Sequence, residues 1–497
     1  MLEAAAEALA LVLAPERIGF LLLGVSIGFV VGILPGLGGL VGMSLLLPFI
    51  FGMDAFSGVA LMIGMVSVIH TSDTFPAVLL GVPGSTGSQA TIMDGYPLSR
   101  QGQAATALGA AFFSSLVGGV IGGVSLFAII LVARPLVLAL NSPALFMLVL
   151  LGLSMVGVLS RHSAGLGILA GLFGMLINTI GAAPAAGLYR YSFGSNYLAD
   201  GIPLPILALG LFAIPELLSL LLSGQSVAGE AKMSGSIARG LRLAMRNKWL
   251  LFRSSVLGTA VGIVPGLGGT VVDWIAYGMA KQTVRDNHFG TGDIRGVIAP
   301  ESANNAKEGG ALVPSLLFGI PGSGTTAVLL GGLIMLGIQP GPSMVGDNLD
   351  VTLSIIWTLV IGNVFAALIC LASAGFIAKL TMVPSRVFAP FLLVLLVLAS
   401  YQTSRQWGDI IALTVFGGLG WFMFKYNWPR APMLIGFVLG TSAERYLGRS
   451  IGLFGFEWLT QPLVIVIGIV IVVTVIGLGR ERSGKSDELS SDAKAKR

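Results

Sequence analysis

The 497-residue chain is 55% hydrophobic and only 10% charged, with a net charge of +5. Soluble proteins carry about 25% charged residues, and so few charged side chains cannot cover the surface of a soluble protein of this length. The composition therefore excludes a soluble enzyme. The positive charge gathers beside apolar runs, which indicates membrane topology rather than nucleic-acid binding.

Long runs without Asp, Glu, Lys or Arg follow one another along the chain. They cover residues 18–53, 55–72, 101–133, 135–160, 162–189, 309–346, 351–378, 387–404, 410–424, 431–443 and 459–479. A helix needs about 20 apolar residues to cross a bilayer. We therefore expect an all-α polytopic membrane protein with roughly ten to twelve transmembrane helices, since a β-barrel would show short alternating segments. The start of the chain lacks the basic segment of a signal peptide, so we expect the first helix to be retained.

Two sequence motifs occur twice, in the same order. Gly32-Ile-Leu-Pro-Gly-Leu-Gly-Gly39 returns as Gly262-Ile-Val-Pro-Gly-Leu-Gly-Gly269, and Gly81-Val-Pro-Gly-Ser85 returns as Gly319-Ile-Pro-Gly-Ser323. The interval between the two copies is nearly the same for both motifs. The chain therefore consists of two homologous membrane repeats, an organisation common in secondary transporters, and we expect the repeats to have inverted topology.

A basic segment, residues 230–253, lies between the two copies and holds six Lys or Arg against the single acid Glu230. A second charged segment ends the chain. Basic residues next to transmembrane helices stay in the cytoplasm. We therefore predict a first membrane repeat at residues 1–229, a basic cytoplasmic linker at 230–253, a second membrane repeat at 254–479 and a charged cytoplasmic tail at 480–497.

In each motif a Pro and several Gly interrupt an apolar run, and a helix should break there because Pro removes an N–H and disfavours helix for the preceding residue. The N-terminal end of a half-helix binds anions through free N–H groups and the helix dipole. We predict a carboxylate site formed by Pro35, Gly36, Gly38, Pro83, Gly84, Ser85, Thr86, Pro265, Gly266, Gly268, Pro321, Gly322, Ser323 and Thr325. The alternative is that these small residues only allow close helix packing.

Three polar segments enter the apolar runs, where ionisable groups commonly serve function. His70, Asp73 and Thr74 are candidates for cation coupling, although a polar pair at the membrane edge is the alternative. Asn304 and Asn305 can donate to a carboxylate and accept from a cation, so we predict them in the substrate site. We expect the segment from Asp94 to Pro97 to be a loop turn with Arg100 as a cytoplasmic anchor; the alternative is that Arg100 pairs with a substrate carboxylate.

The chain contains no His-Glu-x-x-His zinc motif, and its Pro-Gly-Leu-Gly-Gly motifs lack the lysine of a phosphate-binding loop. Asp73 and Asp273 do not occupy matching positions in the repeat, which disfavours an aspartyl enzyme. We therefore expect a transporter and not an enzyme, with no cofactor or resident metal apart from a transported Na⁺.

The paired motifs, the segment from Gly81 to Pro97, the block Ala299-Pro-Glu-Ser-Ala-Asn-Asn305 and Gln339-Pro-Gly-Pro342 together resemble the large permease of tripartite tricarboxylate transporters, the TctA family. The resemblance covers about residues 15 to 475. The family usually has Tyr- and Gly-rich residues before the first Pro-Gly-Ser motif, and here the chain departs from it with Val68-Ile-His-Thr-Ser-Asp-Thr74.

This resemblance implies a multi-pass permease of the bacterial inner membrane that imports citrate or related organic acids, driven by a Na⁺ or H⁺ gradient. It also implies two partners, a small four-helix TctB-like membrane subunit and a periplasmic TctC-like solute-binding protein. Two alternatives are a cation-coupled organic anion exchanger that acts alone and a channel, whose flux would not saturate at low substrate.

Overall fold

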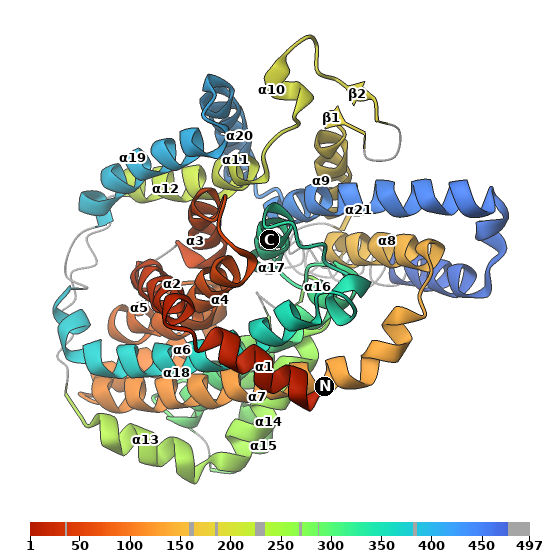
Figure 1. Cartoon of the computed structure of the whole chain (residues 1–497). Coiled ribbons are helices and arrows are strands. Elements are labelled where there is room, and N and C mark those ends of the chain that lie inside the picture. Colours follow the sequence, from red (N-terminus) through yellow and green to blue (C-terminus); the bar gives the residue numbers. More distant parts are fainter. Residues whose placement is uncertain are drawn as a thin grey trace, which may run out of the picture. The chain divides into compact units, whose positions relative to one another are not determined.

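The computed structural model describes residues 1–34, 37–158, 164–183, 187–223, 234–267, 271–286, 288–380 and 385–475. These residues are almost entirely helical, with one two-stranded antiparallel sheet that pairs Gly181 with Arg190 and Ala182 with Tyr189 (Figure 1). The all-α membrane fold predicted from the apolar runs is confirmed.

The chain forms two compact units, and the first holds residues 1–138, 203–317 and 321–421. Its elements are α1 (Leu2–Val12), α2 (Pro15–Ile33), α3 (Gly38–Leu46), η1 (Leu47–Phe49), α4 (Ala55–Ser72), α5 (Thr74–Leu80), η2 (Thr86–Ser88), α6 (Gln89–Arg100), α7 (Ala104–Leu138), α11 (Leu204–Ala208), the π-helix η3 (Leu209–Ala213), α12 (Ile214–Ser223), α13 (Ile237–Arg246), α14 (Lys248–Gly262), α15 (Val272–Thr283), α17 (Gly324–Met335), η4 (Pro342–Val345), α18 (Leu349–Leu380) and α19 (Ser385–Ser404), with most of α16 (Arg295–Phe318) and of α20 (Trp407–Lys425).

The second unit holds residues 139–202, 318–320 and 422–497. Its described elements are α8 (Ser142–Val158), α9 (Ala164–Asn178), β1 (Gly181–Ala182), β2 (Tyr189–Arg190), α10 (Asn196–Ala199), α21 (Arg430–Phe454), η5 (Glu457–Thr460) and the apolar helix Pro462–Val475. Within this unit α21 packs on α8 and α9, with Gly174 and Gly436 at backbone contacts that leave no room for a Cβ.

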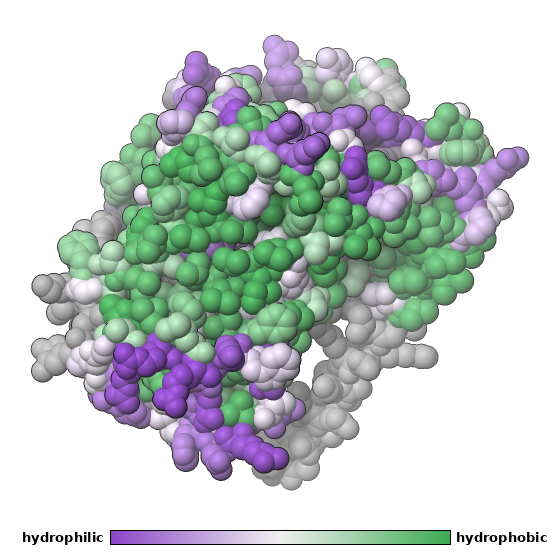
Figure 2. Space-filling view, turned by 60° about the horizontal axis from the view of Figure 1, so that its bottom comes forward, coloured by the Kyte–Doolittle hydropathy of each residue, from purple (hydrophilic) through white to green (hydrophobic). Residues whose placement is uncertain are grey.

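Five helical segments are long and apolar enough to cross a membrane. They are Pro15–Ile33, Ala55–Leu80, Ala104–Leu138, Leu349–Ile377 and Trp407–Lys425, and seven shorter apolar helices accompany them among the described residues. Large apolar side chains such as Val30, Val132 and Leu368 are exposed, and hydrophobic residues cover much of the face in Figure 2. Such a surface is stable in lipid and not in water, so the chain is a multi-pass membrane protein.

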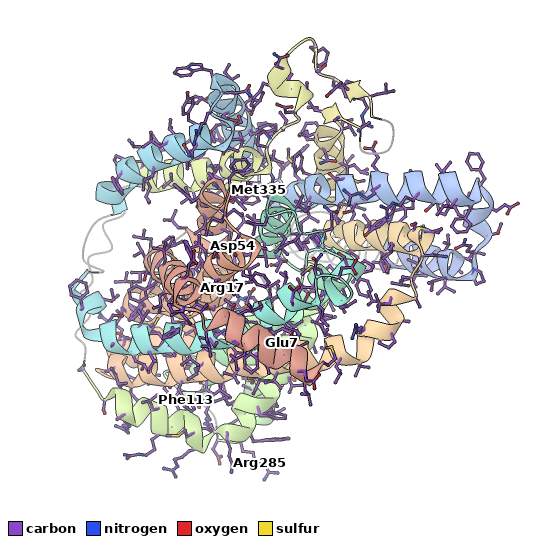
Figure 3. All side chains as sticks on the ribbon, viewed as in Figure 1. Glu7, Arg17, Asp54, Phe113, Arg285 and Met335 are labelled. Carbon is purple, nitrogen blue, oxygen red and sulfur yellow. The ribbon has the colours of Figure 1, made fainter. Side chains whose placement is uncertain are left out.

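Local sequence accounts for where helices begin. Asp54 precedes α4 and accepts hydrogen bonds from the N–H groups of Phe56 (3.0 Å) and Ser57 (3.1 Å), which caps the helix. Arg17 on α2 lies over the Phe56 ring at 4.7 Å, and it also interacts electrostatically with Asp54, which lies just before α4 (Figure 3). The start of α4 is therefore fixed by its own cap and by a contact with α2.

One helix pair packs in the same way in both sequence repeats. In the first repeat α2 packs on α4 at two glycines. A Cβ added to Gly28 would lie 2.6 Å from the Met65 carbonyl oxygen, and a Cβ added to Gly32 would lie 2.9 Å from the Ile69 carbonyl oxygen. In the second, α14 packs on α16 at the equivalent positions. There a Cβ added to Gly258 would lie 2.3 Å from the Ala303 carbonyl oxygen, and a Cβ added to Gly262 would lie 2.4 Å from the Lys307 carbonyl oxygen. The sequence interval that separates the motif copies therefore also separates the packing contacts of α2 with α4 from those of α14 with α16.

The compact units are interleaved along the sequence and do not test the predicted domain boundaries, which stay predictions. Of the predicted linker, residues 230–233 lie outside the described residues. The remainder forms α13 and the start of α14, with Arg239, Arg242 and Arg246 exposed. The predicted tail, residues 480–497, also lies outside the described residues.

Candidate functional site

A helix ends before each of the four Pro-Gly motifs and another begins after it. Breaks separate α2 from α3, α5 from η2 and α6, α14 from α15, and α16 from α17. At the two Pro-Gly-Ser motifs the serine caps the helix that follows. The Ser85 Oγ accepts from the Gly87 N–H at 3.1 Å, and the Ser323 Oγ accepts from the Thr326 N–H at 3.2 Å. Each repeat therefore has two broken helices, as the motifs predict.

The breaks meet one another inside the first compact unit. The Gly266 N–H donates to the Gly322 carbonyl at 3.0 Å and joins the two breaks of the second repeat. In the first repeat, a Cβ on Gly38 would lie 3.8 Å from the Ser85 Cβ. A Cβ on Gly39 would lie 3.3 Å from the Thr325 Oγ1, so the two repeats also meet here.

Each Pro-Gly-Ser loop is fitted closely to the helix before it. A Cβ on Gly84 would lie 2.7 Å from the Asp73 Cβ, and a Cβ on Gly322 would lie 2.8 Å from the Ala311 Cα. Asp73 and Ala311 are separated by the same interval as the two loops themselves, so the loops make equivalent contacts. Only the first repeat has an acid there, and the Ser85 hydroxyl donates to it.

Glu301, on α16, is fully buried and joins three other helices. Its carboxylate accepts hydrogen bonds from Thr74 of α5 (2.9 Å), Thr91 of α6 (2.7 Å) and Ser115 of α7 (3.0 Å). All three hydroxyls donate, which is the arrangement that satisfies a buried carboxylate. Glu301 therefore ties the second repeat to the first.

A charged cluster lies beside this junction. The Glu308 Oε1 accepts from the Lys307 Nζ at 2.8 Å and contacts the His70 Nε2 at 3.0 Å, while the His70 Nδ1 lies 3.8 Å from the Asp73 Oδ2. None of these four residues is more than 8% exposed. Lys307 also donates to the Asn304 carbonyl at 3.1 Å. The predicted coupling residues His70 and Asp73 are thus brought together with two residues of the second repeat.

Asn304 and Asn305 complete the cluster. The Asn305 amide donates to the Thr71 Oγ1 (2.9 Å) and to the Asn363 Oδ1 (3.0 Å). Asn304 lies against the first Pro-Gly-Ser loop, since a Cβ on Gly87 would lie 2.5 Å from its Oδ1. Within the part of the chain that the structure describes, both side-chain amide atoms of Asn304 are buried without a hydrogen-bond partner.

Several other polar atoms of the same cluster are buried and unpartnered among the described residues. They are the Asp73 Oδ1, the His70 Nδ1, the Asn305 Oδ1 and the Glu308 Oε2. Buried polar groups are almost always hydrogen-bonded, and leaving one unmet costs about 1–3 kcal/mol. Such a concentration, packed against the Pro-Gly-Ser break of the first repeat, is what a site for a polar ligand requires.

The structure gives the other predicted site residues different surroundings. Pro83, Ser85, Gly266, Ser323 and Thr325 are half-buried at the breaks, and Thr86 is exposed. Pro265 and Pro321 are buried. Pro35, Gly36 and Gly268 lie outside the described residues.

Sequence reasoning missed Glu301, Lys307 and Glu308, the charged residues of α16. The one sequence feature that could have identified them is their position, because they lie within about one helical turn of the two asparagines. A block this rich in polar residues is typical of a surface helix, and only its burial identifies it as a site.

The segment containing Asp94 is not the loop turn expected from its sequence. It lies within α6, which runs from Gln89 to Arg100 with Pro97 inside the helix. The buried Asp94 carboxylate accepts from the N–H groups of Gly290, Gly292 and Asp293 at 2.8–2.9 Å and from the Tyr277 hydroxyl at 2.9 Å. Its role is to hold the loop before α16.

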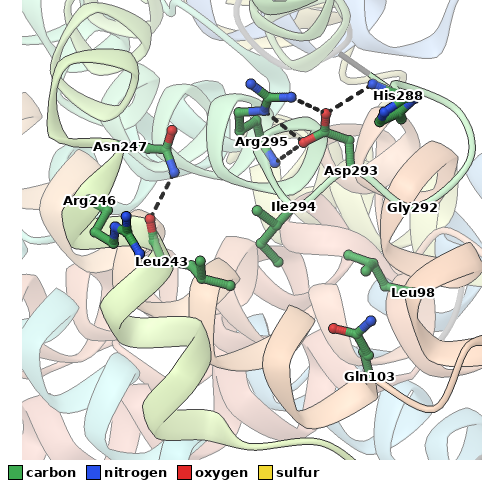
Figure 4. Close-up of a pocket in the computed structure, with 10 residues that line it drawn as sticks. All are labelled: Leu98, Gln103, Leu243, Arg246, Asn247, His288, Gly292, Asp293, Ile294 and Arg295. Atoms are coloured by element: carbon green, nitrogen blue, oxygen red, sulfur yellow. Dashed lines mark hydrogen bonds and ion pairs between the residues drawn. The ribbon is translucent and has the colours of Figure 1, made fainter. Parts of the chain in front are cut away.

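That loop borders a pocket of about 610 Å³ whose lining includes Arg246, His288 and Arg295 (Figure 4). Arg295 donates to both carboxylate oxygens of Asp293, at 2.9 and 2.6 Å, and the His288 N–H donates at 3.1 Å. Burial raises the pKa of Asp293, but these hydrogen bonds lower it more, so the pKa lies below its ordinary value of 3.8.

Two short patterns resemble enzyme motifs, and their surroundings argue against catalysis. Gly448-Arg-Ser-Ile-Gly452 has the residues of a nucleophile elbow, but it lies inside α21 rather than at a strand-to-helix turn. Gly479 to Ser486 has the spacing of a phosphate-binding loop and lies outside the described residues. It follows the apolar helix Pro462–Val475, whereas a phosphate-binding loop follows a strand.

Comparison with protein families gives a match to the model described as the Tripartite tricarboxylate transporter TctA family, over residues 18–435. The chain belongs to the TctA family. Its membership agrees with the helical membrane fold and with the resemblance of the paired motifs, and it makes the chain a component of a membrane transporter.

Two relatives from Agrobacterium vitis were found. One, described as an uncharacterized 52.8 kDa protein in the TAR-I ttuC' 3' region, is 29% identical over 449 residues, which is 88% of this chain and 88% of the relative. The other, an uncharacterized protein in the TAR-II ttuC' 3' region, is 29% identical over 237 residues, 47% of this chain and 98% of the relative. No solved structure matches this TctA-family chain.

Proposed function

We propose that this chain is the large permease subunit of a binding-protein-dependent carboxylate importer of the bacterial inner membrane. The observation that carries the proposal is the set of unpartnered buried polar atoms beside the Pro-Gly-Ser break of the first repeat. The partners would be a TctB-like small membrane subunit and a TctC-like periplasmic binding protein, in keeping with the tripartite family.

In this proposal the substrate carboxylate binds beside Asn304 and Lys307, where the first Pro-Gly-Ser loop packs on Asn304. The Asn304 amide nitrogen is a donor without a partner among the described residues. The Lys307 ammonium has three N–H donors, and two of them are used by Glu308 and by the Asn304 carbonyl, which leaves one for the substrate. The helix ends after Ser85 and Ser323 add the positive end of a helix dipole. A carboxylate therefore finds donors from both repeats.

Charge balance supports coupling to a cation. The cluster holds two carboxylates, Asp73 and Glu308, against Lys307 and a titratable His70. An anionic substrate would bring further negative charge to a buried site whose carboxylates already outnumber its lysine, which is unfavourable at low dielectric. We propose that Na⁺ or H⁺ enters at Asp73, whose Oδ1 is unpartnered in the described structure, and so allows the anion to bind.

Inverted topology is part of the proposal. Contacts pair His70 with Glu308 and Thr74 with Glu301, so residue numbers rise along α4 and α5 while they fall along α16. These are equivalent segments of the two repeats, and they run antiparallel where they meet. Cysteines at Phe51 and Arg285, in the equivalent loops before α4 and α16, should then react with impermeant reagents from opposite sides of the membrane. Reaction from the same side would exclude inversion.

The decisive test is uptake of labelled carboxylates into vesicles that carry the chain and both partners, with Na⁺ and H⁺ gradients imposed separately. Saturable uptake that needs the binding protein and one gradient is expected. Uptake without the binding protein would favour the exchanger that acts alone, and flux that does not saturate would favour a channel. If no carboxylate accumulates under either gradient, the proposed substrate class is wrong.

A further inference from the structure

The unpartnered atoms of the charged cluster are mostly hydrogen-bond acceptors. Among the described residues, the Asp73 Oδ1, Glu308 Oε2, Asn304 Oδ1 and Asn305 Oδ1 can only accept. The Asn304 Nδ2 is the one atom of the set that can only donate, while the His70 Nδ1 can do either. A carboxylate group, which accepts only, cannot satisfy this set by itself.

The orientation of Asn305 is fixed by its neighbours and does not depend on an arbitrary choice of amide rotamer. The Asn363 Nδ2 donates to the Leu359 carbonyl at 2.8 Å, which turns the Asn363 Oδ1 toward Asn305. The Asn305 Nδ2 must then be the group that donates to it, at 3.0 Å. The Asn305 Oδ1 is left as an acceptor, whichever way Asn304 is turned.

Glu308 presents its second oxygen in the same way. Its Oε1 is occupied by Lys307 and His70, at 2.8 and 3.0 Å, and its Oε2 is buried with no partner among the described residues. A buried carboxylate oxygen is a strong acceptor whose desolvation must be offset by a donor. If the coupling cation meets Asp73, the acceptors of Glu308, Asn304 and Asn305 still require donors.

Hydroxyl groups are the donors that an anionic substrate can bring. We infer that the site selects hydroxylated carboxylates, whose carboxylate meets the donors of Asn304 and Lys307 while their hydroxyls donate to Glu308 and Asn305. This inference rests on the proposed function and narrows its substrate class. A site built to accept from a substrate hydroxyl discriminates strongly against an analogue that lacks it, because the acceptor is then left unpaired.

Succinate, malate and tartrate test the inference, because these four-carbon dicarboxylates have the same charge and carry none, one and two hydroxyls. Affinity for the purified protein is measured by calorimetry at constant Na⁺, and uptake competition is measured with the full transport system. Binding should strengthen by about tenfold for the first hydroxyl, the typical effect of one hydrogen bond to a charged group, with malate and tartrate both preferred to succinate. Equal affinity for all three would overturn the inference.

Substitutions test which residues cause the preference for hydroxylated acids. Glu308→Gln keeps one acceptor oxygen and replaces the other by an amide donor, so the ratio of malate to succinate affinity should fall toward one. Asp350→Asn removes an exposed carboxylate at the start of α18, and it should leave that ratio unchanged. A ratio that survives in Glu308→Gln would remove Glu308 from the hydroxyl site.

The failure of the inference is distinguishable from that of the proposed function. If none of the three acids binds or is taken up, the carboxylate proposal fails. If all three acids are transported, and their affinities depend on Na⁺ concentration but not on the number of hydroxyls, the free acceptors are ligands of the cation. In that case the inference alone is wrong. The wild-type ligand series decides between these outcomes even if a variant does not fold.

Discussion

Glu308 occupies the position in the second repeat that His70 occupies in the first, and the two side chains contact each other at 3.0 Å. The interval between them along the chain is the one that also relates Ser85 to Ser323 in the Pro-Gly-Ser loops. A position that meets its own equivalent lies next to a local two-fold axis. The repeats have therefore diverged at their shared centre, one copy carrying a base and the other an acid.

The pair should be energetically coupled. In a double-mutant cycle of His70→Gln and Glu308→Gln, followed by thermal unfolding in detergent, we expect an interaction energy of about 0.5–3 kcal/mol, as for buried residues in contact. Glu308→Gln should be the more damaging single change, since it also leaves the buried Lys307 without its anionic partner. Additive effects would show that the contact is not a stabilising one.

Asn304 and Asn305 should respond differently to truncation. Asn305→Ala breaks hydrogen bonds to Thr71 and Asn363 and should lower the free energy of unfolding by about 1–3 kcal/mol. Asn304→Ala removes a side chain with no described partner, so stability should be little changed while carboxylate affinity falls by about tenfold or more. Measuring both quantities on both variants separates a binding residue from a structural one, and full transport by Asn304→Ala would contradict its assigned role.

The free energy of unfolding should depend on how many acceptor oxygens the side chain at position 301 provides. Glu301→Ala leaves the buried hydroxyls of Thr74, Thr91 and Ser115 without their acceptor, at a cost of about 1–3 kcal/mol for each that stays unmet. Glu301→Gln keeps one acceptor oxygen and should be milder. Thermal unfolding of the two variants tests this order, which fails if the glutamine variant is as unstable as the alanine variant.

Gly84 should not tolerate a methyl group. A Cβ there would lie 2.7 Å from the Asp73 Cβ and from its carbonyl oxygen, so Gly84→Ala should destabilise the protein by about 1–3 kcal/mol and displace Asp73. Gly278→Ala is the matched control, since its Cβ would meet nothing within 4 Å and alanine is the better helix former by about 1 kcal/mol. Equal stability of the two variants would show that the loop can move away.

The Asp293–Arg295 pair gives a pH dependence of known sign. The pKa of Asp293 is lower in the folded protein than its ordinary value of 3.8, so its stabilisation is present above that value and lost as pH falls through the folded pKa. The stability difference between wild type and Asp293→Asn should stay constant from pH 7 to about 5 and shrink below about pH 4. Unfolding midpoints measured over this range would contradict the assignment if the difference shrank near pH 6.

Sequence was sufficient where the signal was local. Apolar run length identified the membrane class, and Pro35, Pro83, Pro265 and Pro321 marked the helix breaks because proline acts on its own backbone. The recurrence of the motifs is accompanied by equivalent packing of Gly32 and Gly262, which was not predicted.

Sequence was not sufficient where function depends on distant partners. Lys307 and Glu308 look like surface charges in a block of polar residues, and nothing local shows that His70 of the other repeat meets Glu308. Asp94 was misjudged for the same reason. Its Gly-Tyr-Pro neighbours favour a turn, but its carboxylate satisfies N–H groups of a loop in the second repeat, and that tertiary contact accompanies a continuous helix.

The hydrogen bonds to Glu301 also bear on how the protein is made. Thr74, Thr91 and Ser115 precede Glu301 by 227, 210 and 186 residues. At a synthesis rate of about 5–20 residues per second, these hydroxyls enter the membrane roughly ten to forty-five seconds before their acceptor exists. The hydrogen bonds that join these first-repeat helices to Glu301 therefore form only after α16 has left the ribosome, so the two repeats are joined after the first has been synthesised.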